Sequence, residues 1–180
     1  MTDEFYVMRD PDQREGLEQM IEWINNISPT SEMRMIEIGS YIGESTMIFA
    51  SKFKEVISVD PYVNDYDPND LACHYAPFDK VYHQFLKNTL PIPNIKSIRD
   101  TSQNAFSVLN DQQWDMVYID GIHTLDGVYY DISNYKNIIK PGGFVCGHDF
   151  GWGNVKHNLG LIFARDVDSS FKDGSWVFRI

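Results

Sequence analysis

The chain has 180 residues, is 43% hydrophobic and 14% aromatic, and carries 15 Lys and Arg against 26 Asp and Glu. This composition excludes a disordered chain, and the length suffices for one buried core, so we expect a single domain over residues 1–180. The formal net charge of −11 argues against a nucleic-acid partner, and the lack of a long apolar run or a signal-peptide core predicts a cytoplasmic protein with no membrane partner.

The first half of the chain alternates between helical and strand-like hydrophobic periodicity. A polar stretch with three prolines over 61–77 interrupts this alternation, and such long irregular segments are often functional lids. The elements expected there are an N-terminal helix over about 12–27, a strand over 33–38, a helix that follows the turn from Gly39 to Gly43, a strand over 56–59 and a helix that begins at Phe78.

The second half continues the alternation. Apolar residues from Leu125 to Ile139 share one helical face, and we expect Pro141, Gly142 and Gly143 to stop that helix. The elements expected there are strands over 95–98, 115–119 and 143–147, helices near 102–110 and 125–139, and a C-terminal part over about 154–180 with a helix near 154–164 and strands near 166–169 and 175–180.

Strands that alternate with helices predict parallel βαβ units and a doubly wound α/β sheet. Ligands of such sheets bind beyond the carboxyl ends of the strands. The residues that follow the expected strands are glycine or polar, and they include the following groups: Gly39 to Ser45, Asp60, Asp100-Thr101-Ser102, Asp120 to His123, and His148-Asp149. Their shared position at one edge of the sheet points to a binding site.

Each of these residues also has a purely structural interpretation. The glycine turn can serve only to connect a strand to a helix, and Asp60 can be a solvated turn residue before Pro61. Asp100 can cap the helix that follows it, and His123 can be an ordinary loop histidine. It is the convergence of all five strand ends that favours a functional site.

A nicotinamide dinucleotide requires the spacing G-x-G-x-x-G, whereas this turn has G-x-x-x-G with Tyr41 at the second glycine position. The bulky side chain obstructs the passage of a pyrophosphate over the turn. A nicotinamide-dependent dehydrogenase is therefore disfavoured, and a nucleoside ligand without a pyrophosphate suits the turn better.

Four blocks of the sequence resemble the class I S-adenosylmethionine-dependent methyltransferases, in particular the small bacterial O-methyltransferases. The similarity extends from about residue 30 to 150, with a core over about 33–150. The blocks are the turn E-I-G-S-Y-I-G-E-S from Glu37 to Ser45, I-D-G-I-H from Ile119 to His123 with V-Y-Y-D-I from Val128 to Ile132, P-G-G at 141–143 and H-D-F at 148–150. Leu125 departs from the pattern, which usually has an aromatic residue there.

The resemblance implies a Rossmann-like, mostly parallel sheet of seven strands whose last strand is antiparallel. It also implies that S-adenosylmethionine is the cofactor. By position, the amino-acid end of the cofactor would lie on Glu37 and on the turn that carries Gly39, Ser40, Gly43 and Ser45. Asp60 would bind the ribose and Tyr62 would lie against the nucleoside. Asp100 would accept from the adenine amino group beside Thr101 and Ser102, and Asp120 would face the transferred methyl group.

Related sugar and catechol O-methyltransferases bind a divalent cation, and the resemblance places its ligands at Asp120, His148 and Asp149. Mg²⁺ or another divalent cation is thus a second expected cofactor, with a metal-free site as the alternative. Deprotonation of a hydroxyl acceptor would be aided by the cation or by a base, for which His123 is the candidate.

Two function classes follow from these residues. The first is methyl transfer to a hydroxyl of a small molecule, with a sugar as one acceptor, and homo-oligomerisation is left open. The second is a noncatalytic nucleotide-binding protein that keeps this fold, which would bind the cofactor without turnover.

Overall fold

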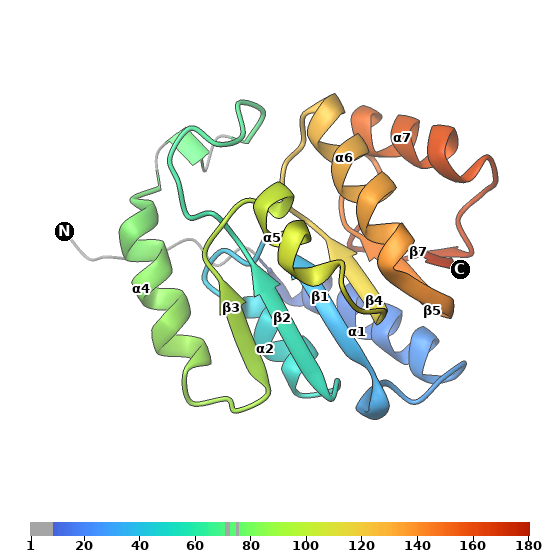
Figure 1. Cartoon of the computed structure of the whole chain (residues 1–180), viewed down its shortest axis with the longest axis horizontal. Coiled ribbons are helices and arrows are strands. Elements are labelled where there is room, and N and C mark those ends of the chain that lie inside the picture. Colours follow the sequence, from blue (N-terminus) through green and yellow to red (C-terminus); the bar gives the residue numbers. More distant parts are fainter. Residues whose placement is uncertain (1–8, 71–72, 75) are drawn as a thin grey trace.

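A seven-stranded sheet forms the centre of the computed structural model, which describes residues 9–70, 73–74 and 76–180 (Figure 1). The strands are β1 (Arg34–Ile38), β2 (Glu55–Val59), β3 (Ile95–Ile98), β4 (Trp114–Ile119), β5 (Ile139–Gly147), β6 (Ser169–Ser170) and β7 (Trp176–Arg179). Their order is β3-β2-β1-β4-β5-β7-β6. The first five are parallel to one another, and β7 is antiparallel to both β5 and β6. The expected Rossmann-like sheet of seven strands with an antiparallel last strand is confirmed.

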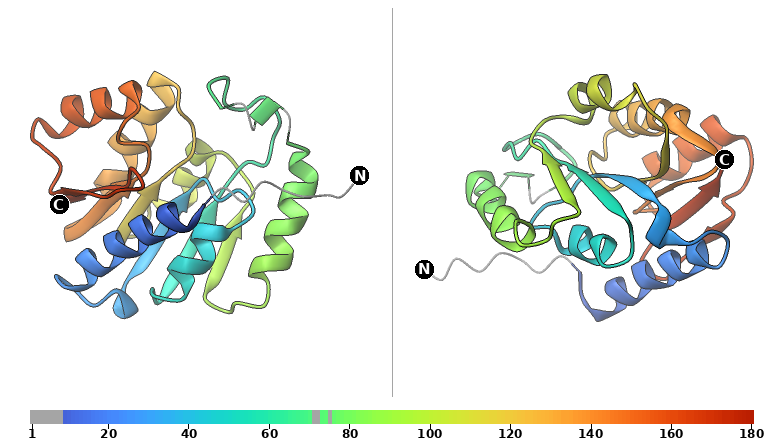
Figure 2. Two further views of the ribbon diagram at one scale, coloured as in Figure 1. Left: turned by 180° about the vertical axis from the view of Figure 1, so that it is seen from behind. Right: turned by 60° about the horizontal axis from the view of Figure 1, so that its bottom comes forward.

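Helices cover both faces of this sheet (Figure 2). They are α1 (Pro11–Asn25), α2 (Glu44–Ala50), α4 (Phe78–Thr89), α5 (Ser102–Leu109), α6 (Leu125–Tyr135) and α7 (Gly153–Phe163). Two short 3₁₀ turns, η1 (Thr30–Glu32) and η2 (Lys136–Ile138), connect some of them to strands. Helix α1 begins where it does because Asp10 and Gln13 form a capping box and Pro11 occupies the first turn.

The period-2 alternation of the strands divides the core between the two faces. One set of alternate strand residues, such as Ile36 and Val117, packs against α5, α6 and α7. The other set, such as Met35 and Tyr118, packs against α1 and α2. Because both faces are covered, the central strands read as nearly continuous apolar runs, which is the pattern of a parallel sheet.

Two expected elements have different bounds. The helix expected over 125–139 ends at Tyr135, and Ile139 begins β5 instead, paired with Trp114 of β4. The register of β4 and β5 then shifts so that Met116 faces Phe144, and the Pro-Gly-Gly run lies within the irregular start of the strand rather than after a helix. The strand expected near 166–169 is displaced to Ser169–Ser170, where it pairs with β7.

The chain order reverses between β1 and β4, since β2 and β3 lie on one side of β1 whereas β4 and β5 lie on the other. The carboxyl ends of β1 and β4 approach closely there. A Cβ added to Gly39 would lie 2.0 Å from the carbonyl oxygen of Asp120, and Gly39 has φ +86°. Only glycine fits this position, which opens the crevice where doubly wound sheets bind their ligands.

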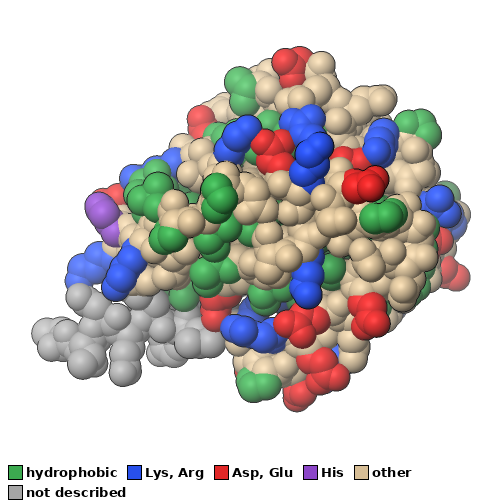
Figure 3. Space-filling model, turned by 90° about the horizontal axis from the view of Figure 1, so that it is seen from below, with side chains coloured by type: hydrophobic (Ala, Val, Ile, Leu, Met, Phe, Trp, Pro, Cys, Tyr) green, Lys and Arg blue, Asp and Glu red, His purple; other side chains and the backbone are tan. Residues whose placement is uncertain are grey.

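The opposite end of the molecule carries the amino ends of the strands. On that face, basic and acidic side chains are interspersed and the described residues form no continuous basic surface (Figure 3). Among the described helices, none combines the length and the apolar character that a membrane-spanning helix needs.

Candidate active site

A cleft of about 500 Å³ lies at the carboxyl edge of the sheet. Its volume is within the range of small-molecule sites. Nine of the site residues expected from the sequence line it: Gly39, Ser40, Ser45, Asp60, Ser102, Asp120, His123, His148 and Asp149. The segment after β2 closes one side of the cleft with Tyr66 and Asp67, and Arg9 comes in from the chain before α1.

Asp60, which follows β2, is the acceptor that organises the turn after β1. Its Oδ2 accepts the backbone N–H groups of Ser40 at 2.9 Å and Tyr41 at 3.0 Å. Its Oδ1 accepts the N–H of Tyr62 at 2.9 Å. Burial raises the pKa of Asp60, and these three N–H donors counter the rise. The carboxylate still lines the cleft, so it can also face a ribose.

Glu37 lies one layer below the cleft rather than in its wall. Its side chain is fully buried on β1, and its two carboxylate oxygens accept the hydroxyls of Ser45 and Thr46 in the first turn of α2. Burial raises its pKa to about 7, although both hydroxyl groups counter the rise. Glu37 therefore fixes α2 against β1 and supports the Gly39 turn from beneath.

Gly43 and Tyr62 differ from the roles that the resemblance implies. Gly43 has φ +87°, and a Cβ there would lie 3.0 Å from Phe85 and 3.1 Å from Thr89 of α4, so packing and backbone geometry require the glycine. The ring of Tyr62 is 3% exposed and packs against Tyr82 and Phe85. Neither residue lines the cleft.

Asp100 and Thr101 also lie outside the cleft wall. The Asp100 carboxylate accepts the backbone N–H of Thr101 at 2.7 Å and the side-chain amide of Asn104 at 2.8 Å. The Thr101 hydroxyl accepts the N–H of Asn104, as a helix N-cap does. Both side chains therefore cap the N-terminus of α5. For Asp100 this is the structural role, capping of the following helix, that the sequence left open.

His123 is held between two carboxylates. Its Nδ1 lies 2.7 Å from Oδ2 of Asp67 and its Nε2 lies 2.8 Å from Oδ2 of Asp149. Burial alone would lower the pKa of His123, but the two carboxylates outweigh burial and raise it to about 9. The imidazole therefore carries a proton at neutral pH. The Trp152 ring packs against it with ring centroids 4.6 Å apart, which gives this site an aromatic wall, whereas Leu125 does not line the cleft.

His148 bridges Asp120 and Asp149 on the side away from His123. Its Nδ1 lies 3.6 Å from Oδ1 of Asp120 and 3.2 Å from Oδ1 of Asp149. Burial opposes protonation here as well, but the two carboxylates raise the pKa of His148 to about 9. Asp149 has φ +57°, an uncommon backbone conformation for a residue other than glycine that places its carboxylate between the two imidazoles.

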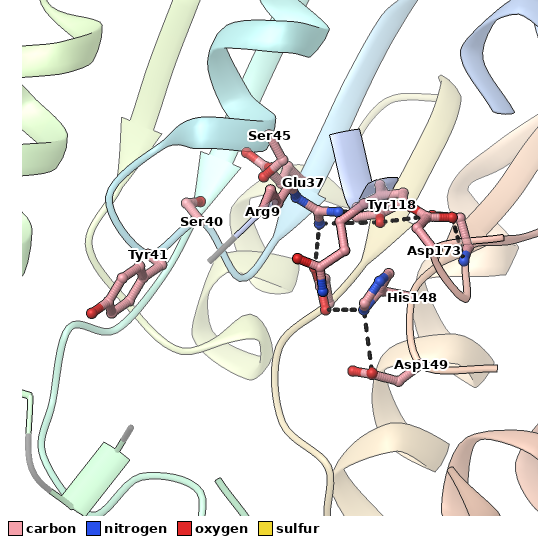
Figure 4. A network of polar contacts seen from close by, with 12 residues as sticks. Arg9, Glu37, Ser40, Tyr41, Ser45, Tyr118, His148, Asp149 and Asp173 are labelled. Carbon is pink, nitrogen blue, oxygen red and sulfur yellow. Dashed lines mark hydrogen bonds and ion pairs between the residues drawn. The ribbon is translucent and has the colours of Figure 1, made fainter. Parts of the chain in front are cut away.

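Arg9 joins the network of polar contacts that includes His148 and Asp149 (Figure 4). Its guanidinium donates to Asp120 Oδ2 at 2.8 Å and to the Tyr118 hydroxyl at 3.3 Å, and it lies 3.8 Å from Asp173. Neither Arg9 nor Asp67 was identified from the sequence. Asp67 lies in the expected lid segment, which was the only signal for it, and no sequence pattern distinguishes Arg9.

Three side chains could share a cation: one ligand atom each from Asp120, His123 and Asp149 lie within 4.8 Å of one another. This set differs from the expected one because His123 takes the place of His148, which contacts both carboxylates from the other side. Two carboxylates and one imidazole suit Mg²⁺ or Mn²⁺ better than zinc.

The described residues also fit a nucleoside that bears a positive charge. Carboxylates line the cleft at the ends of β2, β4 and β5, namely Asp60, Asp120 and Asp149.

The family model of a methyltransferase domain matches residues 36–150, which is more than half of the chain. No curated protein sequence matches. Among solved structures, the N-methyltransferase NodS from Bradyrhizobium japonicum WM9 with S-adenosyl-L-homocysteine has 15% sequence identity and a TM-score of 0.65, covering 99% of this chain and 92% of that one. An O-methyltransferase from Bacillus cereus, also with S-adenosyl-L-homocysteine, has 11% identity and a TM-score of 0.60, with coverages of 97% and 93%.

An rRNA methylase from Streptococcus thermophilus has 12% identity and a TM-score of 0.61, with 96% of each chain covered. Because these three proteins are named for three kinds of acceptor, the shared fold does not identify the acceptor of this chain. The match over 36–150 shows that the chain belongs to the methyltransferase-domain family, and it is an S-adenosylmethionine-dependent methyltransferase.

Proposed function

We propose that this methyltransferase acts on a hydroxyl oxygen of a small molecule, with sugars among its acceptors, and that a divalent cation on Asp120, His123 and Asp149 assists the reaction. The observation that supports the proposal is the convergence of these three side chains at the cleft. S-adenosylmethionine, when bound, supplies a methyl group made electrophilic by a positively charged sulfur.

Residues around Asp120, His123 and Asp149 would position the cofactor and the acceptor. Asp60 fixes the turn after β1 and faces the cofactor side of the cleft. Asp67 and Trp152 flank His123 and hold its imidazole in place. An acceptor hydroxyl held beside Asp120 and Asp149 would lose its proton more readily next to a cation. Most of the remaining rate enhancement would come from alignment of the acceptor.

The protonated state of His123 argues against a histidine base at neutral pH. A histidine whose pKa is about 9 holds its proton at neutral pH and is a poor proton acceptor there. A cation bound between Asp120 and Asp149 would replace that proton, because a metal ligand must be the neutral imidazole. With its proton displaced, His123 becomes a ligand.

The test is a methyl-transfer assay on the full chain that follows S-adenosyl-L-homocysteine formation over a panel of sugars, catechols and aliphatic alcohols. We expect EDTA to abolish transfer, Mg²⁺ or Mn²⁺ to restore it, and cofactor binding to persist in EDTA. Asp149→Asn should behave like the chelated enzyme, whereas Asp126→Asn, an exposed aspartate of α6, should remain active.

Three other outcomes would contradict the proposal in distinguishable ways. Full activity in EDTA would remove the cation from the reaction. Transfer to amines but not to hydroxyls would overturn the acceptor class. Cofactor binding without turnover on any acceptor would favour the noncatalytic protein.

A further inference from the structure

Asp67, in the segment after β2, contacts His123 through a single carboxylate oxygen. Its Oδ2 lies 2.7 Å from Nδ1 of the imidazole and accepts the backbone N–H of the same histidine at 2.6 Å. Its Oδ1 accepts the backbone N–H of Asn69 at 2.9 Å, and the residue is only 2% exposed. This burial and pairing distinguish Asp67 from a solvated loop residue.

The backbone and the ring of His123 are also held by other contacts. Asn69 donates its side-chain amide to the His123 carbonyl oxygen at 3.2 Å, and Asn154 of α7 donates to the same oxygen at 2.9 Å. The Trp152 ring packs against the imidazole with centroids 4.6 Å apart. Because the residue is fixed in this way, each of its two ring nitrogens has a defined direction.

The two nitrogens of this imidazole face different partners. Nδ1 faces Asp67, whereas Nε2 lies 2.8 Å from Oδ2 of Asp149, which belongs to the proposed cation cluster. A neutral imidazole carries its proton on one nitrogen only, and the hydrogen bond that the ring makes decides which nitrogen it is. A carboxylate beside Nδ1 keeps the proton there and leaves the lone pair of Nε2 for a cation.

We infer that Asp67 is a positioning residue for the cation site, which keeps the proton of His123 on Nδ1 and directs Nε2 toward the cation. The inference rests on the proposed function, since it takes His123 to be a ligand. Asp67 acts through His123, so the affinity for the cation depends on a residue that is not itself a ligand. Partners of this kind typically contribute roughly 10- to 100-fold to metal affinity.

The experiment measures Mn²⁺ binding to the full chain by electron paramagnetic resonance, with neither cofactor nor acceptor present. Asp67→Ala should weaken Mn²⁺ binding by roughly 10- to 100-fold, because Nδ1 loses its acceptor. Asp67→Asn should keep most of the affinity, since an amide oxygen can accept the same proton. Pulsed measurements should detect an imidazole nitrogen on the bound Mn²⁺ of the wild type and lose it in His123→Gln. Asp67→Ser, whose hydroxyl is too short to reach Nδ1, replaces Asp67→Ala if that variant does not fold.

Asn69→Ala is the matched control, because it removes a contact between the same segment and the His123 carbonyl without touching the imidazole. It should keep the wild-type Mn²⁺ affinity. Wild-type affinity in Asp67→Ala, an equal loss in Asn69→Ala, or a loss in Asp67→Asn as large as that in Asp67→Ala would each overturn the inference alone. Failure of the wild type to bind Mn²⁺, or unchanged binding in His123→Gln, would overturn the proposed cation site together with it.

Discussion

Nδ1 of His123 lies 2.7 Å from Oδ2 of Asp67, so the segment after β2 is fastened to the loop after β4. The same carboxylate oxygen accepts the backbone N–H of His123 at 2.6 Å, and Asn69 donates to the His123 carbonyl at 3.2 Å. The Asp67 side chain is 3% exposed. One buried carboxylate therefore holds the outer wall of the cleft in place.

We expect Asp67→Ala to release the segment over 61–70 from His123 without unfolding the sheet. Amide hydrogen exchange of a peptide from this segment should become faster, while exchange in β1 and β4 should stay slow, because local opening requires only the loss of these contacts. Asp126→Ala, an exposed change on α6 outside this segment, is the control. Unchanged exchange in Asp67→Ala would mean that other contacts hold the segment.

Asp60→Ala should weaken the binding of S-adenosyl-L-homocysteine by about 1.5–3 kcal/mol, the usual loss for a hydrogen bond to a charged group. The structure adds a second reason, since Ser40 and Tyr41 lose the acceptor that orders their turn. Calorimetry measures the affinity and circular dichroism checks the fold. Asp111→Ala, an exposed change after α5, should leave the affinity unaltered. Wild-type affinity in a folded Asp60→Ala would refute the role of this acid.

Arg9→Met should destabilise the protein, because it leaves the partly buried Asp120 carboxylate without its guanidinium. Removal of one partner from a buried ion pair costs roughly 3–5 kcal/mol, and the Arg9 side chain is only 8% exposed. Urea unfolding monitored by tryptophan fluorescence gives the free energy of unfolding. Lys172→Met, which breaks an exposed pair with Asp12 and Glu15, should have no measurable effect. Equal free energies of unfolding for Arg9→Met and Lys172→Met would contradict a stabilising ion pair between Arg9 and Asp120.

The sequence predicted the sheet well, because buried parallel strands and amphipathic helices have strong periodic patterns. It was less reliable at Ile139, whose apolar side chain fits the helical face of α6 equally well, and only its pairing with Trp114 places it in β5. The irregular pairing around the Pro-Gly-Gly run depends on the partner strand, which local sequence does not reveal.

Site residues were predictable where their position depends only on the end of a strand. They were not predictable where the role depends on the direction of the side chain. Asp60 and Asp120 follow buried strands, so topology alone brings them to one edge. Asp100 also follows a strand, but its carboxylate caps α5. Arg9 reaches Asp120 across 111 residues of sequence, and no local pattern encodes such a contact.

The unfolding free energy should depend on pH through the two buried acids that line or underlie the cleft. Burial raises the pKa of Glu37 and Asp131 to about 7, well above their values in an unfolded chain. Between about pH 4 and 7 the folded state therefore binds more protons than the unfolded state, and stability falls as the pH rises through this window. The effect is absent at lower pH and complete above about pH 7.

Asp131→Asn removes one of these two buried acids, and so it should flatten the pH profile. Comparing urea unfolding at pH 5 and pH 8, we expect the variant to lose less stability than the wild type, by at most about 3 kcal/mol, since only about two units of the pKa shift lie between pH 5 and the folded pKa of about 7. The histidines at the cleft titrate in both proteins, so the difference between the two profiles isolates Asp131. Asp126→Asn should follow the wild-type profile, since Asp126 is exposed. An equal loss of stability in Asp131→Asn and wild type would show that the Asp131 carboxyl titrates in the folded protein as it does in the unfolded chain.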